Sequence, residues 1–143
     1  MALKKMGKFG ITKKYFYGSL LYGLAATAAG FVALNALALL VFGYKTPSFN
    51  ALWLLFYIFI SAPLQELVFR GILQTYLYRF GVTSAIVGAS LIYAAAHFYN
   101  PVLMALTFPA GLVWGFLFAK KPSIIGPAVS HAILGVYLFV FIL

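Results

Sequence analysis

The chain has 143 residues, of which 65% are hydrophobic and only 8% are charged, and its mean hydropathy is +1.06. A soluble globular domain carries about 45–50% apolar and about 25% charged residues, so this composition excludes that class and predicts a polytopic membrane protein. The formal net charge of +9 would suggest nucleic acid as the partner of a soluble protein. Here the cations lie in short segments between apolar runs, which excludes nucleic-acid binding and favours contact with anionic lipid.

Several apolar segments approach or exceed the length of about 20 residues that crosses a bilayer. They cover residues 17–43, 51–78, 83–99, 102–119 and 123–143. The first follows a basic leader but runs for about 26 residues, longer than the 7–15 of a signal-peptide core, so we expect a retained helix. The second is too long for one straight crossing, and Pro63 is the expected point of bending. We predict an all-α bundle of about five transmembrane helices, forming a single membrane domain over residues 1–143.

The cations also predict an orientation. If the N-terminus is cytoplasmic and five helices alternate, Lys45 lies outside the membrane. The cations that fall inside are Lys4, Lys5, Lys8, Lys13, Lys14, Arg79, Lys120 and Lys121. We therefore expect an integral protein of a prokaryotic plasma membrane, with the lipid bilayer as its surroundings. The sequence carries no signal for the oligomeric state.

Glu66 is the only acidic residue, and it lies in the second apolar segment. A carboxylate in hydrocarbon costs several kcal/mol unless it is paired or functional. Arg70 is four residues away, on the same helix face, so a purely structural ion pair is as good an interpretation as a functional one. A lone buried histidine is more often a packing residue than a ligand or base. Two histidines at comparable depth, His97 and His131, favour a shared functional cavity with Glu66.

Elimination narrows the chemistry that such a cavity could perform. No cysteine is present, which excludes disulfides and cysteine nucleophiles, and no aspartate is present for an aspartyl protease. The chain contains no His-Glu-x-x-His, and Gly88-Ala89-Ser90-Leu91 lacks the Gly-x-Ser-Gly setting of a membrane serine protease. What remains is a carboxylate, or its neighbour, together with two histidines.

At these residues the chain resembles a known family, the glutamate-dependent intramembrane proteases. This family includes the CAAX prenyl endopeptidases and the bacterial bacteriocin-processing or immunity proteins. The family motif Glu-Glu-x-x-x-Arg is matched from Gln65 to Arg70 except at its first glutamate, and Phe-x-x-x-His is matched from Tyr93 to His97 with one aromatic exchange. The motif His-x-x-x-Asn is matched in part, from His131 to Gly135. The resemblance covers about residues 60–140.

The resemblance implies a role for each matched residue. Position 65 would hold the general base that activates water, with His97 as its partner, and Glu66 and Arg70 would form a supporting bridge. His131 would bind the oxyanion, assisted by the asparagine that is here Gly135. The substrate would be a membrane-anchored peptide or protein. Family members are often described as metalloproteases, but two histidines and one carboxylate are a thin ligand set, so we expect no cofactor and favour water activation without metal.

Gln65 departs from the motif, because a neutral amide cannot accept the proton of water. It is either an introduced inactivating substitution, which we prefer because the other motif residues are largely intact, or the mark of a natural non-catalytic member. Glu66 serving as the base is a third, weaker interpretation. Two rivals to the protease follow: a non-catalytic immunity or binding protein with the same fold, and a small proton-coupled transporter. No internal repeat supports the transporter.

Overall fold

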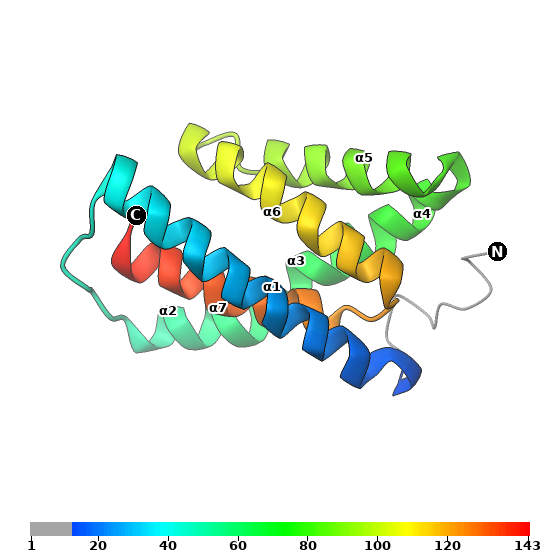
Figure 1. Cartoon of the computed structure of the whole chain (residues 1–143), viewed down its shortest axis with the longest axis horizontal. Coiled ribbons are helices and arrows are strands. Elements are labelled where there is room, and N and C mark those ends of the chain that lie inside the picture. The colour runs from blue at the N-terminus through cyan, green and yellow to red at the C-terminus, as the bar shows by residue number, and fades with distance from the viewer. Residues whose placement is uncertain (1–12) are drawn as a thin grey trace.

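The computed structural model describes residues 13–143, which form five helical rods and contain no strand (Figure 1). The first rod comprises a 3₁₀ turn at Lys13–Tyr15, α1 at Phe16–Leu37 and a π-helical end at Ala38–Phe42. The second comprises α2 at Ala51–Phe56, α3 at Ala62–Glu66 and α4 at Thr75–Leu77, joined by π-helical segments at Tyr57–Ser61 and Leu67–Gln74 and ended by a 3₁₀ turn at Tyr78–Phe80. The others are α5 at Val82–Ala95, α6 at Pro101–Lys120 and α7 at Ile125–Phe141. The predicted all-α class is confirmed.

The distribution of side chains is that of a membrane protein. Large apolar side chains point outward, among them Leu21 at 68%, Leu40 at 84% and Leu52 at 81% exposure. The interior instead contains Glu66 and Arg70, both fully buried. Three helices, Lys13–Phe42, Ala51–Phe80 and Pro101–Lys120, are long and apolar enough to cross a membrane, and α5 and α7 are shorter apolar helices. Polar residues inside and apolar residues outside are expected where lipid is the solvent. The chain is therefore an integral membrane helical bundle.

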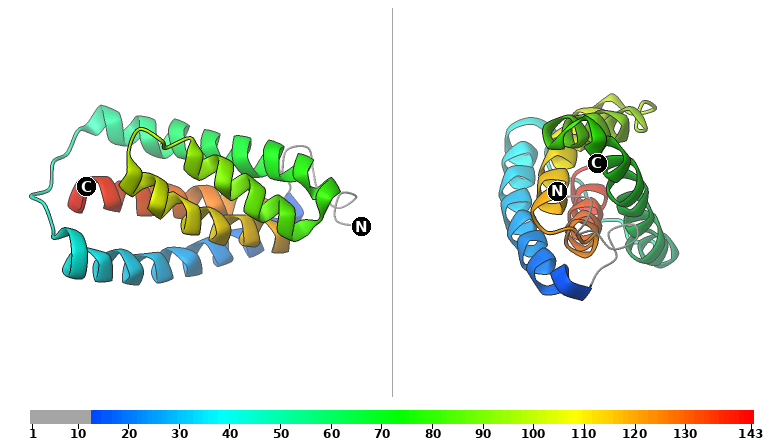
Figure 2. Two further views of the ribbon diagram at one scale, coloured as in Figure 1. Left: turned by 90° about the horizontal axis from the view of Figure 1, so that it is seen from above. Right: turned by 90° about the vertical axis from the view of Figure 1, so that its right-hand side faces the viewer.

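Helix α7 lies inside the bundle, with α1 on one side and the Ala51–Phe80 rod on the other (Figure 2). Its contact with α1 depends on glycine. A Cβ atom on Gly23 would lie 2.3 Å from the carbonyl oxygen of Gly126, so only glycine permits this approach. The Ser19 hydroxyl donates to the carbonyl of Ser123 at 2.8 Å and accepts from the N–H of Gly126 at 3.1 Å. These contacts fix the start of α7, which positions His131 nearly two turns later.

Helix α5 ends earlier than the sequence indicated. We expected an apolar span to residue 99, but α5 stops at Ala95 and is only 14 residues long. The reason lies in the next helix, because Pro101 disfavours helical geometry at Asn100, whose side chain instead caps α6 by accepting from the N–H groups of Val102 and Leu103. His97 therefore lies on a tight turn between two helices rather than within a helix.

The Ala51–Phe80 rod departs from α-helical geometry around Pro63, the residue expected to bend it. Pro63 lies in the first turn of α3, immediately after the π-helical segment at Tyr57–Ser61. Proline lacks an N–H and clashes with the preceding turn, and a wider π turn relieves both problems. A second π-helical segment begins at Leu67, directly after Glu66. The two acidic-motif positions, Gln65 and Glu66, thus lie on a short α-helical stretch between two widened turns.

Candidate functional site

The polar centre of the bundle is a three-residue group around Glu66. Its Oε2 atom lies 3.3 Å from Nε of Arg70, and its Oε1 atom lies 2.8 Å from Nδ1 of His131. Glu66 and Arg70 are fully buried, and His131 is 3% exposed. The i,i+4 pairing expected from the sequence is present, and it is joined by a histidine from α7 that is 65 positions further along the chain. The carboxylate is thereby paired on both oxygens, as burial in an apolar interior requires.

His131 uses both of its ring nitrogens within this group. Because Nδ1 faces a carboxylate oxygen, it carries a hydrogen and donates a hydrogen bond to Glu66, and Nε2 lies 3.2 Å from the hydroxyl of Tyr93. The indole of Trp114 stacks on the imidazole, with ring centres 4.4 Å apart and planes 17° apart, and donates to Ser130 at 3.1 Å. The orientation of His131 is therefore fixed from every side.

Helix α6 accommodates Arg70 through two glycines. A Cβ atom on Gly111 would lie 3.3 Å from Nη2 of Arg70, and one on Gly115 would lie 3.4 Å from Nη1. These two guanidinium nitrogens have no hydrogen-bond partner within residues 13–143, and the guanidinium lies 5.7 Å from the ring centre of Tyr93. The small-x-x-x-small pattern at Gly111 and Gly115 therefore makes room for a buried arginine inside the monomer.

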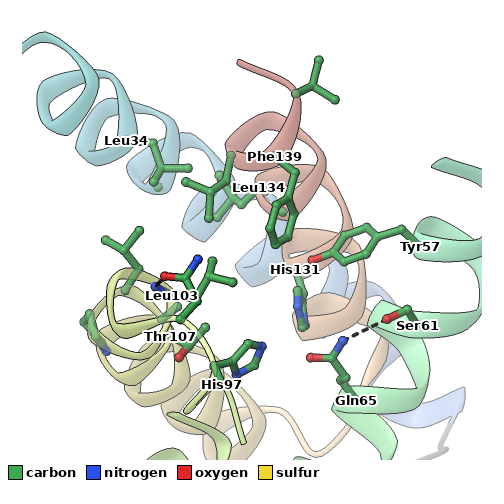
Figure 3. A pocket seen from close by; sticks show the side chains of 18 of the residues that line it. Leu34, Tyr57, Ser61, Gln65, His97, Leu103, Thr107, His131, Leu134 and Phe139 are labelled. Carbon is green, nitrogen blue, oxygen red and sulfur yellow. Dashed lines mark hydrogen bonds between the residues drawn. The ribbon is translucent and has the colours of Figure 1, made fainter. Parts of the chain in front are cut away.

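Gln65 faces away from the ion pair and toward a cavity. Its amide nitrogen donates to the hydroxyl of Ser61 at 3.0 Å. In Figure 3 the amide oxygen of Gln65 and the imidazole of His97 point toward one another across the cavity. This placement follows from sequence, because adjacent helical residues lie about 100° apart, so only one of Gln65 and Glu66 can join the buried group.

His97 is held by the turn after α5. Its Nδ1 lies 2.9 Å from the carbonyl oxygen of Tyr93, and a carbonyl can only accept, so Nδ1 carries the proton. In the neutral ring, Nε2 is then an unprotonated acceptor on a half-buried side chain that lines the cavity. A hydrogen-bond donor such as water could be positioned there. His97 thus differs from His131, whose two ring nitrogens both have hydrogen-bond partners.

The cavity has a volume of about 960 Å³ and is bounded by α1, the Ala51–Phe80 rod, α6 and α7 (Figure 3). Its deep polar residues include Tyr57, Ser61, Gln65, Thr107 and both histidines, whereas its walls are largely leucine, alanine and aromatic side chains. It extends to Lys45, Ser48 and Asn50, in and next to the loop that follows the first rod. A mostly apolar cavity with a few convergent polar groups is the usual form of a ligand site.

Three of the four residues expected at this cavity line it, namely Gln65, His97 and His131. Glu66 does not, because its carboxylate is turned to Arg70 and His131 and is fully buried. The expectation that all four face the cavity is corrected accordingly. Glu66 instead binds Arg70 and His131, and the supporting role that the family resemblance implied for Glu66 and Arg70 stays a prediction.

Position 135 is the end of the third motif, and here the structure adds a residue that the sequence did not indicate. A Cβ atom on Gly135 would lie 1.9 Å from the hydroxyl oxygen of Tyr57, so this hydroxyl occupies the space of a side chain at position 135. Tyr57 was overlooked because no spacing rule connects it to α7. The hydroxyl of Tyr93, which holds His131, was overlooked because only its aromatic ring entered the motif. Trp114 had no sequence signal at all.

The side chains present do not fit a resident metal ion. Within the part of the chain that the structure describes, no three His, Asp, Glu or Cys side chains gather in a group that could hold one. Both oxygens of Glu66 and both ring nitrogens of His131 already have partners, which leaves Nε2 of His97 as a single ligand.

The chain also matches a known protein family. A family model described as type II CAAX prenyl endopeptidase, Rce1-like, matches residues 47–137, which is more than half of the chain. The match begins in the loop before α2 and ends within α7, so it contains the three motifs and starts earlier than the expected core of residues 60–140. No curated protein and no solved structure matches the chain.

Proposed function

The chain belongs to the Rce1-like type II CAAX prenyl endopeptidase family, a family of intramembrane proteases, and from this premise we propose that its cavity is the peptide-binding site of an intramembrane endopeptidase. The observation that carries the proposal is that Gln65 and His97 point toward one another across the cavity (Figure 3). Glu66 instead binds Arg70 and His131 and does not line the cavity. A base position that faces the cavity and a supporting position that does not is the division that hydrolysis requires.

The substrate class follows from the walls of the cavity and from the family. A mostly apolar cavity within a membrane protein suits a lipid-modified or otherwise membrane-anchored peptide, and the family is described as cleaving prenylated CAAX peptides. We propose a membrane-anchored peptide or protein as the ligand, with the anchor against the leucine-rich wall and the peptide backbone near Gln65 and His97.

In the chain with Gln65 the site binds but does not cleave, because the amide of Gln65 accepts no proton. The variant Gln65→Glu supplies the missing base. The oxygen of a water molecule positioned by Nε2 of His97 then bonds to the scissile carbonyl carbon, and its proton passes to the new carboxylate. That proton moves on to the amine nitrogen as the carbon–nitrogen bond breaks. No metal ion takes part in this scheme.

The test is cleavage by purified protein in lipid nanodiscs. The probe is a peptide that ends in an S-farnesyl cysteine followed by three residues, and mass spectrometry detects its products. Gln65→Glu should cleave the probe, and adding His97→Ala should reduce the rate at least about 100-fold, the scale of general acid–base catalysis. The matched control is Gln74→Glu, which makes the same exchange at a fully buried glutamine in the same rod, outside the cavity. Equal activity in the two glutamate variants would contradict the proposal.

The second candidate is a binding or immunity protein that does not cleave in any form. The observation that favours it is the hydrogen bond that the amide of Gln65 donates to Ser61, a bond that needs no carboxylate at position 65. It predicts that Gln65→Glu binds the farnesylated probe but leaves it intact over hours. The same assay therefore separates the two functions.

We also propose an orientation with the N-terminus in the cytoplasm. The start of the first rod, the end of the second and the end of α6 lie at one end of the bundle, and the loop between the first two rods lies at the other (Figure 1). The first set of ends carries Lys13, Lys14, Arg79, Lys120 and Lys121, and the loop carries Lys45, whereas Lys4, Lys5 and Lys8 lie outside the described residues. This asymmetry supports a cytoplasmic face at the cation-rich end. The cavity extends to the opposite end, toward Ser48 and Asn50, so it would be reached from the non-cytoplasmic side.

A further inference from the structure

The hydroxyl of Tyr57 lies where the third motif would end in a polar side chain. Gly135 has no side chain, and a Cβ atom there would lie 1.9 Å from the Tyr57 hydroxyl oxygen, 2.6 Å from Cζ and 2.7 Å from Cε1. Figure 3 shows the hydroxyl pointing to α7, between Phe139 and His131, and marks no hydrogen bond from it to the other cavity residues drawn. Within the described residues this hydroxyl is thus a hydrogen-bond donor without a partner, at the position of the missing side chain.

The other polar groups of α7 cannot take this role in the arrangement observed. His131 donates from Nδ1 to Glu66, and its Nε2 is engaged by the hydroxyl of Tyr93. The Ser130 hydroxyl accepts from the indole N–H of Trp114, and this side chain is fully buried and does not line the cavity. Tyr57, which meets the space beside Gly135, does line the cavity, and within residues 13–143 its hydroxyl has no hydrogen-bond partner.

The tyrosine is also held rigidly. Its ring stacks on Trp53, with centres 5.1 Å apart and planes 15° apart, and it contacts Phe139 edge to face at 5.9 Å. The side chain is only 8% exposed, and it is packed with Ala62 and Ala132. A donor that is fixed before the ligand arrives costs little reorganisation when it forms its bond, which is the property that carbonyl and oxyanion sites need.

We propose that the Tyr57 hydroxyl donates a hydrogen bond to a backbone carbonyl oxygen of the bound peptide, replacing the side chain absent at position 135. In the Gln65→Glu variant the same donor stabilises the negative oxygen that forms when water adds to that carbonyl. The inference rests on the proposed function, because it assumes that a peptide occupies the cavity. It goes further by assigning the recognition of its carbonyl group to a residue outside the three motifs.

The experiment measures binding by the chain with Gln65 in nanodiscs, so it does not depend on cleavage. The ligands are the farnesylated probe and a set of its analogues in which each peptide bond in turn is replaced by a trans-alkene. This replacement removes the carbonyl oxygen and the N–H but keeps the shape, and the comparison with Tyr57→Phe assigns the loss to the oxygen. One analogue should bind about 10-fold more weakly than the parent, the loss expected for one hydrogen bond. Tyr57→Phe should bind that analogue and the parent equally. Tyr17→Phe, at a tyrosine that is 78% exposed on α1 outside the cavity, should retain the difference.

The outcomes separate the two claims. If the parent probe binds and Tyr57→Phe still distinguishes the analogues, the inference fails while the proposed function stands. If the parent probe does not bind the chain with Gln65 at all, the proposed function fails, and the inference fails with it. A further variant tests the replacement itself: with Gln65→Glu as background, Tyr57→Ala should slow cleavage, and adding Gly135→Asn should restore part of the rate by placing an amide in the vacated space. No gain from Gly135→Asn in that background would count against the inference.

Discussion

The buried group around Glu66 makes a quantitative prediction for Arg70→Met. The closest contact of the pair is 3.3 Å between fully buried groups, which at an effective dielectric constant of about 20 corresponds to about 5 kcal/mol of attraction. Removing one partner leaves the Glu66 carboxylate buried with only the N–H of His131, and such changes cost about 3–5 kcal/mol. We therefore expect Arg70→Met to lower the free energy of unfolding by about 3–5 kcal/mol.

The measurement is an unfolding titration in mixed micelles, followed by tryptophan fluorescence in a Trp53→Phe background, so that the signal comes from Trp114, which stacks on His131 within the group. The matched control is Arg79→Met, because Arg79 is exposed at the end of the same rod and its loss should change the free energy by less than about 0.5 kcal/mol. Adding Glu66→Gln to Arg70→Met should recover part of the loss, since it removes the uncompensated charge. A cost below about 1 kcal/mol for Arg70→Met, or one equal to that of Arg79→Met, would refute the reasoning.

Two further predictions follow from single contacts, and a third follows from the proposed orientation. Gly135→Ala should lower the free energy of unfolding by about 1–3 kcal/mol, because its Cβ atom would lie 1.9 Å from the Tyr57 hydroxyl. In a Tyr57→Ala background the same change should cost much less, which a double-mutant cycle of the original chain, the two single variants and the double variant measures. Gly115→Ala should destabilise by a similar amount, since its Cβ atom would crowd the amide oxygen of Gln74 at 3.1 Å, and the same titration serves as the check. In a chain without cysteine, Ser48→Cys should react in intact cells with a maleimide that cannot cross the membrane, whereas Lys121→Cys should react only after permeabilisation; the reverse pattern would contradict the proposed orientation.

The helices were largely predictable from the sequence, because long apolar runs have few alternatives in a membrane protein. The expected ranges match the observed rods to within a few residues at most ends. The exception is α5, which stops at Ala95. Asn100 caps the next helix and Pro101 begins it, so the residues before them form a turn instead of continuing α5. Local sequence patterns predict that a helix ends near a proline but not by how many residues.

The site was predictable where its contacts are local. The pairing of Glu66 with Arg70 follows from the i,i+4 spacing. Helical geometry also explains why Gln65 faces away from this pair and toward the cavity. The bond from His131 to Glu66 joins residues 65 positions apart, so it depends on how α7 packs. The position of the Tyr57 hydroxyl over Gly135 depends on the same packing. In the sequence, Gly135 marked only a lost side chain, whereas the structure places another residue in that space.

Photocrosslinking of the chain with Gln65 shows whether a membrane-anchored peptide binds in the cavity between Gln65 and His97. A farnesylated peptide with a photoreactive group on its backbone would be irradiated in nanodiscs, and the adducts mapped by mass spectrometry. The account predicts adducts on cavity residues such as Tyr57, His97 and Thr107, which an excess of unlabelled peptide suppresses. Adducts spread over outward-facing residues such as Leu21 and Leu52, unaffected by that competition, would contradict it.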